Sequence, residues 1–412
     1  MGNNVVIIGA GQAGGRTAEH LRAQGYDGTI HLIGEEPHAP YERPPLSKDF
    51  LTDGTAAAAL TIIAPQTWDR LGIAFLPATA ATAIDRAARI VRLSDGSRLQ
   101  YDALVMATGA RPRTLPLPVP ADCPVHYLRT IADAEALRVR LRPGRHLCVI
   151  GAGVIGLEIA ASARALGLDV TVIERDAEPL GRIVPPAIGA WFWRFHEDAG
   201  IHVLCGVMPT DVSGDGDGVR IDLSDGSWIE ADLVAVGIGV VPNVELLAGQ
   251  GIDISDGILV DASCRSADPN ILAVGDVARP FRPLLGRAVR LEAWRNAERQ
   301  PAVAAATLLG QRQIYDEVPW MWSDQHGLNL QVAGRPHDGD QTVVRGDPSS
   351  DRFAVGYLRD GVLVGAITVN QGRDMRSLQT LIAARATIEP ESFANRGTSL
   401  AGMRPPANGR SG

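Results

Sequence analysis

The sequence predicts an α/β protein with two similar parallel-sheet units, followed by a smaller C-terminal α+β domain. Three observations predict this class. A buried strand runs into a glycine-rich turn at residues 5–14 and again at residues 147–156. In each copy a second predicted strand ends at an acidic residue. Residues 319–412 instead alternate short strands and a hairpin with one helix, which is typical of an α+β domain.

The first glycine-rich turn has the sequence VVIIGAGQAG, at residues 5–14. Gly9 allows the tight turn, Gly11 lets the backbone approach a pyrophosphate, and Gly14 lets the following helix pack close to the strand. Phosphates then bind to the free N–H groups at the helix N-terminus. The next strand, residues 29–34, ends at Glu35, about where a carboxylate that binds ribose belongs.

Taken alone, this pattern also fits a glycine-rich loop in an ordinary parallel sheet. The chain repeats it, however, with Gly151, Gly153 and Gly156 after a second buried strand. The strand at residues 170–173 leads to Glu174, so the terminal acid is repeated as well. The fold class is therefore two Rossmann-like dinucleotide-binding domains plus a C-terminal α+β domain. One flavin site and one nicotinamide site account for both copies.

Composition excludes several other classes. The 412-residue chain is long enough for two or three domains and carries a formal net charge of −8, which argues against nucleic acid or an anionic membrane as its main partner. No apolar run approaches the roughly 18 residues that span a bilayer. The N-terminus enters a predicted strand almost at once, so we expect no signal peptide and a cytoplasmic protein.

The four cysteines are far apart, at positions 123, 148, 205 and 264, with no CxxC pair. Scattered cysteines favour small buried thiols in a reducing compartment. We expect no metal site and no sequence-local redox disulfide.

Lys48 is the only lysine among 39 basic residues, and all the others are arginine. An ammonium is compact and can lose a proton, whereas a guanidinium is a planar fork. The retained lysine therefore indicates a site that needs an ammonium. The alternative is one surface lysine kept by chance.

The remaining elements follow from turn and periodicity signals. Before the second glycine-rich turn we predict a proline-stiffened loop at 37–48, a hairpin at 90–99, a strand at 101–106, a crossover at 111–124 and a helix at 130–141. After it we predict a hairpin turning at 225–226, strands at 231–241, 257–260 and 270–274, and a helix between Arg299 and Pro319. The C-terminal domain should contain strands at 328–332 and 342–345, a hairpin at 353–369, a helix at 373–386 and a loosely held tail from Arg396.

Four motifs extend the pattern beyond the glycines: YERPPLSK at 41–48, GIGVVPN at 237–243, LAVGDV at 272–277 and PWMWSDQ at 319–325. With them the chain resembles, over nearly its full length, the NADH-dependent ferredoxin reductases of bacterial oxygenase systems (the putidaredoxin reductase and biphenyl dioxygenase reductase type). The resemblance implies an FAD domain (1–110 and 244–318) interrupted by an NADH domain (111–243), with a C-terminal domain at 319–412.

The same resemblance implies the site residues. FAD would be held by Ala13, Glu35, Arg43, Lys48, Arg129 and Asp276, and more loosely by Ala81 and Trp294. NADH would be held by Gly151, Gly153, Gly156, Glu158 and Glu174, and Gly239 is counted with the cofactor-binding residues. Lys48 and Glu158 would form the catalytic pair, with Lys48 stabilising negative charge on the reduced flavin.

Several of these residues also have a structural interpretation. Glu158 could favour a helix N-terminus and Asp276 could cap a helix. Trp320 and Trp322 could be core aromatics or could lie at the flavin edge where electrons leave. Glu174 should favour NADH by binding both ribose hydroxyls and repelling the extra phosphate of NADPH, although Arg175 could soften that preference.

The function implied is electron transfer from NADH through FAD to a two-iron, two-sulfur ferredoxin that feeds an oxygenase. The alternatives are an NADH oxidase, a rubredoxin or quinone reductase, and a non-enzymatic flavoprotein like apoptosis-inducing factor. Six arginines crowd the segment after Asp276 and could form a basic ferredoxin-docking patch or a solvated face balanced by acids. They are Arg279, Arg282, Arg287, Arg290, Arg295 and Arg299.

Overall fold

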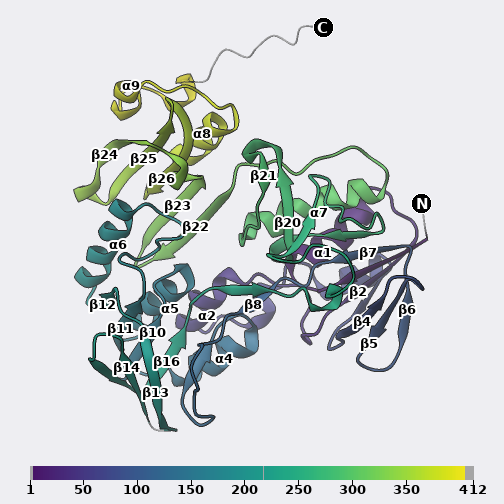
Figure 1. Ribbon diagram of the computed structural model, residues 1–412, viewed down its shortest axis with the longest axis horizontal. Coiled ribbons are helices and arrows are strands. Elements are labelled where there is room, and N and C mark those ends of the chain that lie inside the picture. The colour runs from purple at the N-terminus through teal and green to yellow at the C-terminus, as the bar shows by residue number, and fades with distance from the viewer. Residues whose placement is uncertain (1–2, 217, 404–412) are drawn as a thin grey trace. The chain divides into compact units, whose positions relative to one another are not determined.

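The computed structural model describes residues 3–216 and 218–403, and the chain divides into two compact units (Figure 1). Unit 1 contains residues 1–44, 56–111 and 240–317. Unit 2 contains residues 45–55, 112–239 and 318–412. Each unit is therefore built from three separate stretches of chain.

Unit 1 is organised around a parallel sheet with the strand order β19-β7-β1-β2-β3. Its strands are β1 (Asn4–Ile8), β2 (Thr29–Ile33), β3 (Ile73–Leu76), β7 (Ala103–Met106) and β19 (Ile271–Ala273). Alternate side chains of β1 face opposite sides of the sheet, so Val5 and Ile7 enter one apolar core while Val6 and Ile8 enter another. The first core includes apolar residues of α1 (Gln12–Ala23) and α7 (Trp294–Leu308), which contact each other.

Smaller elements complete unit 1. They are α3 (Pro65–Arg70), the antiparallel strands β4 (Ala81–Asp85), β5 (Ile90–Leu93) and β6 (Arg98–Gln100), and the sheet of β18 (Ile258–Val260), β20 (Ala278–Arg282) and β21 (Arg287–Ala288). Trp68 of α3 packs in the first core, whereas apolar side chains of the small sheets pack in the second. Both faces of the parallel sheet are therefore covered. Strands β8 (Ala110–Pro112) and β17 (Val240–Pro242) pair where the chain leaves and re-enters unit 1.

Unit 2 contains a second parallel sheet, with the strand order β12-β11-β10-β16-β9. Its strands are β9 (Val125–Tyr127), β10 (His146–Ile150), β11 (Asp169–Glu174), β12 (His202–Cys205) and β16 (Leu233–Val236). The accompanying elements are α2 (Asp49–Thr52), α4 (Ile131–Arg140), α5 (Val154–Ala165), α6 (Pro186–Asp198) and the sheet of β13 (Pro209–Asp215), β14 (Gly218–Leu223) and β15 (Trp228–Ala231).

An antiparallel sheet forms the C-terminal part of unit 2, in the order β22-β23-β26-β25-β24. Its strands are β22 (Trp320–Gln325), β23 (Leu328–Gly334), β24 (Gln341–Asp347), β25 (Arg352–Arg359) and β26 (Val362–Val369). Helices α8 (Gly372–Ala383) and α9 (Pro390–Ala394) pack on it through a core that includes Leu378 and Phe393. The sequence prediction of an α+β domain is confirmed for this part.

Local signals predicted most of these elements. The hairpins at Asp95-Gly96 and Asp225-Gly226 are present, as is the one in which β25 and β26 pair. Thr130 caps α4 in a reciprocal capping box with Asp133, which fixes the helix start.

The helix expected between Arg299 and Pro319 is wrong at both ends. Helix α7 begins at Trp294, continues through Pro301 and ends at Leu308. Pro301 lacks only one backbone donor, and helix residues beyond it, including Val303 and Leu308, are buried in the unit 1 core. Packing against α1 therefore outweighs the helix-breaking tendency of the proline.

The loosely held tail expected from Arg396 is also wrong for residues 396–403. Arg345 is 8 % exposed, and its guanidinium donates to the backbone carbonyls of Phe393, Asn395, Arg396 and Thr398. Leu400 is buried in the adjoining core. Residues 404–412 lie outside the described part of the chain.

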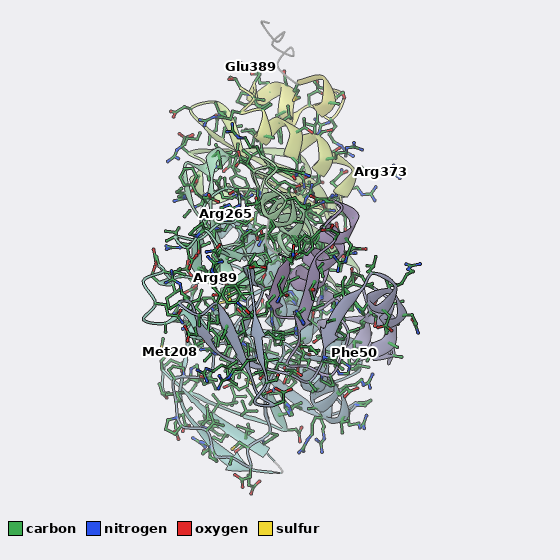
Figure 2. All side chains as sticks on the ribbon, turned by 90° about the vertical axis from the view of Figure 1, so that its right-hand side faces the viewer. Phe50, Arg89, Met208, Arg265, Arg373 and Glu389 are labelled. Carbon is green, nitrogen blue, oxygen red and sulfur yellow. The ribbon has the colours of Figure 1, made fainter. Side chains whose placement is uncertain are left out.

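Figure 2 draws the described side chains and labels Phe50 and Met208 among them. Phe50 is buried, with the Arg138 guanidinium 4.8 Å from its ring centroid, whereas Met208 is exposed. Within the described residues, none of the helices combines the length and apolarity needed to cross a bilayer.

Candidate functional site

The two glycine-rich turns have the same backbone construction. The Gly9 N–H donates to the Ile33 carbonyl at 2.9 Å, and the Gly151 N–H donates to the Ile173 carbonyl at 2.7 Å. Gly9 and Gly151 have φ angles of +110° and +105°, which side chains rarely adopt. The duplication predicted from sequence is thus confirmed at the level of single hydrogen bonds.

Close packing explains two glycines of each turn. A Cβ on Gly14 would lie 1.8 Å from the Gly9 carbonyl oxygen, and one on Gly156 would lie 2.0 Å from that of Gly151. Either contact is far shorter than van der Waals separation. The third glycine of every fingerprint therefore lets helix and strand approach, as the sequence predicts.

The middle glycines differ, because no close backbone contact requires them. A Cβ on Gly11 would have no heavy atom of the described chain within 4 Å, and one on Gly153 would meet only the Gly237 oxygen at 3.7 Å. Gly11 and Gly153 are the N-caps of α1 and α5, and within the described residues neither helix has a side-chain cap or an acid in its first turn. The space and the uncapped N–H groups suit a pyrophosphate in each unit.

Unit 1 brings two of the residues expected to hold FAD, Ala13 and Asp276, to the start of α1. Ala13 lies in the first turn, and a Cβ on Gly275 would be 2.8 Å from the Ala13 Cβ. That close approach places Asp276, half-buried in the turn after β19, beside the helix N-terminus. The Gln300 side chain of α7 accepts from the Gly275 N–H at 2.8 Å and holds this turn.

Arg43 is also in unit 1 and is fixed by its neighbours. Its guanidinium contacts Glu36 at 2.7 Å and donates to the Tyr41 hydroxyl at 2.8 Å. Burial acts to lower the pKa of Arg43, but Tyr41, Glu36 and Asp276 together raise it above its ordinary value. Arg43 is therefore a permanent cation in the neighbourhood of Asp276.

The other FAD candidates are placed less tightly. Glu35 is exposed, two residues after the end of β2. In the parallel sheets Ile8 pairs with Ile33 and Ile150 pairs with Ile173, so Ile33 and Ile173 are equivalent. The residue that follows each is Gly34 in unit 1 and Glu174 in unit 2, so Gly34, and not Glu35, is the counterpart of Glu174. The two acids that look equivalent in sequence therefore differ by one residue in register.

Ala81 begins β4 and Trp294 begins α7, both in unit 1 and both partly buried. Lys48 and Arg129 belong to unit 2. Arg129 is partly buried just before α4, where its backbone N–H donates to Asp133 at 3.1 Å.

Glu174 is the last residue of β11 and is anchored at the turn before α5. Its Oε2 accepts from the Ala152 N–H at 2.7 Å, and its Oε1 accepts from the Asp176 N–H at 2.9 Å. Each carboxylate oxygen keeps a second lone pair for a ribose hydroxyl. Arg175 is exposed and pairs with Asp176 at 3.3 Å, so a carboxylate offsets its charge. Gly239 has a φ of +101°, and a Cβ there would be 3.1 Å from the Arg182 guanidinium.

The catalytic pair expected from sequence is present within unit 2. The Lys48 ammonium lies 2.7 Å from Oε2 of Glu158, whose side chain is only 4 % exposed. Ser47 donates to the same oxygen at 2.5 Å, and Ser323 donates to Oε1 at 2.6 Å. Glu158 is therefore a buried carboxylate with three donors and not a surface residue that favours a helix N-terminus.

Sequence reasoning missed the two serines. Ser47 and Ser323 lie inside YERPPLSK and PWMWSDQ, so the signal was the motifs themselves. Trp320 and Trp322 of the second motif stack on each other, with ring centroids 5.3 Å apart.

Burial disfavours thiol chemistry at three of the four cysteines. Burial raises the pKa of Cys148, Cys205 and Cys264 to about 12, so these thiols carry almost no thiolate at neutral pH. All four cysteines are free. Within the described residues there is also no cluster of three or more histidine, cysteine or acidic side chains that could hold a metal.

The arginine cluster after Asp276 is not a continuous basic patch. Arg279 pairs with Asp253 at 2.6 Å, Arg290 with Asp256 at 2.8 Å, and Arg295 with Glu317 at 3.0 Å. Arg282 is 1 % exposed and stacks on the Tyr315 ring. Arg290 also pairs with Glu292 at 2.6 Å, as the interpretation of a solvated face balanced by acids expects. Four of the six charges are thus neutralised or buried.

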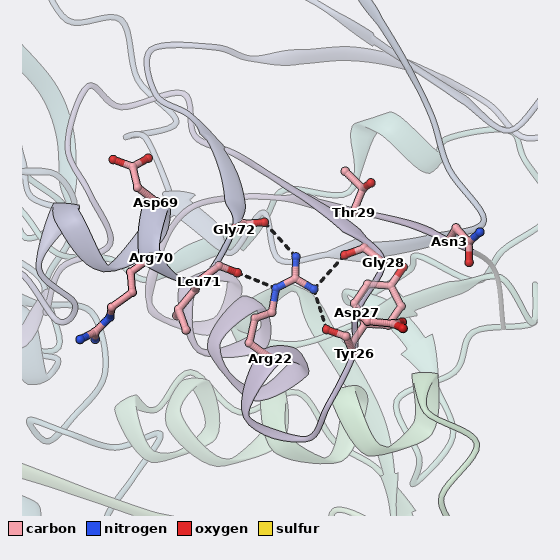
Figure 3. A pocket seen from close by; sticks show the side chains of 10 residues that line it. All are labelled: Asn3, Arg22, Tyr26, Asp27, Gly28, Thr29, Asp69, Arg70, Leu71 and Gly72. Atoms are coloured by element: carbon pink, nitrogen blue, oxygen red, sulfur yellow. Dashed lines mark hydrogen bonds between the residues drawn. The ribbon is translucent and has the colours of Figure 1, made fainter.

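A shallow hollow of unit 1 can also be set aside as a ligand site (Figure 3). Its central cation, Arg22, donates to the backbone carbonyls of Tyr26, Gly28, Leu71 and Gly72 at 2.6 to 2.8 Å. These bonds tie the end of α1 to the starts of β2 and β3. The guanidinium is already used as a structural clip.

Comparison with known proteins identifies the family. The pyridine nucleotide-disulphide oxidoreductase model matches residues 3–301, and the reductase C-terminal model matches residues 320–403. The ferredoxin–NAD(+) reductase component of an anthranilate 1,2-dioxygenase system from Burkholderia cepacia is 47 % identical over 391 residues, covering 95 % of this chain and 96 % of that protein.

Two solved structures agree. A ferredoxin reductase from Rhodopseudomonas palustris has a TM-score of 0.95 and 38 % identity, covering 98 % of this chain and all of that one. The covalent putidaredoxin reductase–putidaredoxin complex has a TM-score of 0.94 and 36 % identity, covering 97 % and 98 %. The chain therefore belongs to the pyridine nucleotide-disulphide oxidoreductases and, within them, to the ferredoxin–NAD(+) reductases.

Proposed function

We propose that the protein is an FAD-dependent oxidoreductase that passes electrons from NADH to a [2Fe-2S] ferredoxin serving an oxygenase. The observation that carries the proposal is the duplicated glycine turn, with an uncapped helix N-terminus in each unit. Ferredoxin as the acceptor is supported by the relatives, whose names describe reductase components of dioxygenase systems.

The residues divide the work as follows. The start of α1 and Gly11 would bind the FAD pyrophosphate, with Arg43 and Asp276 beside it. The start of α5 would bind the NADH pyrophosphate, and Glu174 would bind the adenosine ribose. The domains proposed for these tasks are 1–110 with 244–318 for FAD, 111–243 for NADH, and 319–412 at the C-terminus.

Bound FAD would supply the chemistry, because a flavin can accept one hydride, which carries two electrons, from NADH and release the electrons one at a time. The protein orients the reactants and supplies charge. The Glu158 carboxylate, at 2.7 Å, holds the Lys48 ammonium in place, and Lys48 would stabilise negative charge on the reduced flavin. Since no proton must be moved by a side chain, Glu158 has no acid–base task in this scheme.

The state of the thiols supports a one-electron carrier as the electron acceptor. Burial raises the pKa of Cys148, Cys205 and Cys264 to about 12, which disfavours the thiolate that would pass electrons to a disulfide or peroxide. A one-electron carrier is the acceptor that needs no further protein group. The scattered free cysteines also support a cytoplasmic location.

The test is NADH consumption by the flavin-loaded protein with and without an oxidised [2Fe-2S] ferredoxin. We expect stimulation of at least about tenfold over the rate with oxygen alone, because two-electron transfer to oxygen is not assisted by any group described above. Ferredoxin stripped of its cluster is the matched control, since it keeps the protein surface without the acceptor. Rapid oxygen-dependent turnover that ferredoxin does not change would contradict the proposal and favour an oxidase.

A further inference from the structure

A line of buried polar side chains connects Glu158 with helix α6. Ser323 and Gln325 alternate on β22 with the exposed Asp324, so both point to the buried side of that strand. Gln325 Nε2 lies 2.9 Å from the Ser323 hydroxyl, and Gln325 Oε1 lies 2.8 Å from Nε2 of His196. Ser323 and His196 are fully buried and Gln325 is 2 % exposed.

The carboxylate at one end sets the direction of every hydrogen bond in this line. Glu158, paired with Lys48, only accepts hydrogen bonds, so the single proton of Ser323 must point to it. The Ser323 oxygen is then left to accept from the Gln325 amide. Gln325 must therefore turn its oxygen to His196, and His196 must carry its proton on Nε2.

The surroundings of His196 are consistent with that neutral form. Burial and, to a smaller extent, the neighbouring His326 lower the pKa of His196 to about 4, although the hydrogen bond with Gln325 acts to raise it. Its Nδ1 has no hydrogen-bond partner in the described part of the chain. The aromatic rings of Phe192, Phe195 and His326 pack around it.

Backbone geometry fixes where the line begins. His326 and Gly327 both have positive φ angles, +50° and +76°, and form a two-residue turn between β22 and β23. The turn pairs Gln325 with Leu328 and Ser323 with Leu330, which sets the inward face of β22. A slip of one residue would turn Ser323 away from Glu158.

We propose that Ser323, Gln325 and His196 are positioning residues, which form a one-way hydrogen-bond relay that holds the Glu158 carboxylate and thereby the Lys48 ammonium in place. The relay extends the catalytic pair into the C-terminal sheet. Through the relay, the C-terminal sheet affects the rate at which NADH reduces the flavin, in addition to any contribution of the sheet to binding the electron acceptor. This inference rests on the role that the proposed function gives to Lys48.

Ser323→Ala removes the last donor of the relay, and Gln325→Glu reverses its direction because a carboxylate competes for the Ser323 proton. The limiting rate of flavin reduction by NADH, measured by stopped flow, should fall about tenfold in each, since one charge-assisted hydrogen bond is lost. Ser323→Thr keeps the hydroxyl and should recover most of the rate. Thr368→Val is the matched control, because it deletes another fully buried hydroxyl of the same sheet, one with no partner among the described residues.

A double-mutant cycle separates positioning from packing. If Ser323 acts through the ion pair, adding Ser323→Ala to Lys48→Met should cost less than about twofold. Equal losses in the two backgrounds would overturn the relay and leave Ser323 as a packing residue.

A second readout does not depend on activity. Lys48 is the only lysine, so in the flavin-loaded protein acetic anhydride labels one side-chain amine, and the α-amino group serves as the internal reference. Labelling of Lys48 should become about fivefold faster in Ser323→Ala and Gln325→Glu, as the ion pair loosens, and should not change in Thr368→Val. Unchanged labelling in Ser323→Ala would also overturn the relay. Both measurements omit ferredoxin, so a failure of the ferredoxin assay is distinguishable from a failure of the relay.

Discussion

Replacing Gly11 by alanine tests the cofactor assignment of unit 1 without disturbing the fold. An alanine Cβ there would have no heavy atom of the described chain within 4 Å. The backbone angles, φ −79° and ψ −169°, are ordinary for alanine. Because alanine is a poorer N-cap than glycine, the folded protein should lose about 1 kcal/mol or less.

The effect on FAD should be larger than the effect on stability. A methyl group in this open space would keep a phosphate oxygen from reaching hydrogen-bond distance of the α1 N-terminus. The loss of one charge-assisted hydrogen bond costs about 1.5 to 3 kcal/mol. That converts to roughly 10- to 150-fold weaker FAD binding.

The assay is FAD affinity of the apoprotein, followed by quenching of flavin fluorescence, together with the thermal midpoint. Gly153→Ala is the matched control in unit 2, because its Cβ would meet only one atom, at 3.7 Å. It should keep FAD and weaken NADH binding by a similar factor. If Gly11→Ala retained full FAD affinity while Gly153→Ala lost it, the assignment of the two turns would be reversed.

Three further predictions concern single side chains. Glu174→Ala should lower the ratio of kcat/KM for NADH over NADPH by at least about tenfold, because the carboxylate that repels the extra phosphate is gone. Steady-state kinetics with both nucleotides measure this ratio, and an unchanged ratio would show that other residues discriminate between NADH and NADPH. Arg345→Met should destabilise unit 2 by about 3 kcal/mol, since four carbonyls lose their donor. Its thermal midpoint should fall by several degrees and protease should cut near residue 396, whereas a wild-type midpoint would show that the clip is dispensable. His196 has a folded pKa of about 4, below its unfolded value of about 6.5, so the unfolded chain binds the extra proton and stability falls as pH drops from about 6.5 to 4. His196→Gln should remove about 3 kcal/mol of the stability loss between about pH 6.5 and pH 4. Thermal midpoints of the wild type and the variant, measured across this pH range, check this, and midpoints that fall in parallel in the two proteins would contradict it.

Features governed by neighbouring residues were predictable from the sequence. Turns such as Asp95-Gly96 and the start of the helix predicted at 130–141 depend on four or five consecutive residues, and the structure confirms them. The glycine fingerprints also belong to this class, since a strand, a turn and a helix lie within ten residues.

Features governed by distant partners were not predictable in this way. Helix α7 passes through Pro301 because it packs on α1, nearly 280 residues earlier in the chain. The arginines after Asp276 look like one basic run, but acids such as Asp253 and Glu317 pair with three of them. The alternation of β22 that points Ser323 to Glu158 is set by its turn and its pairing with β23, and the motif alone does not reveal which face is buried.

The almost complete use of arginine has a consequence for alkaline solutions. A guanidinium keeps its proton far above the range where lysine loses one, so ion pairs such as Arg43–Glu36 and clips such as Arg22 persist as pH rises. Burial also raises the pKa of Tyr315 and Cys264 to about 12. With one lysine in the chain, the net charge of the folded protein should change less between about pH 8 and pH 11 than that of a protein of ordinary lysine content. Its electrophoretic mobility over this range should change correspondingly less.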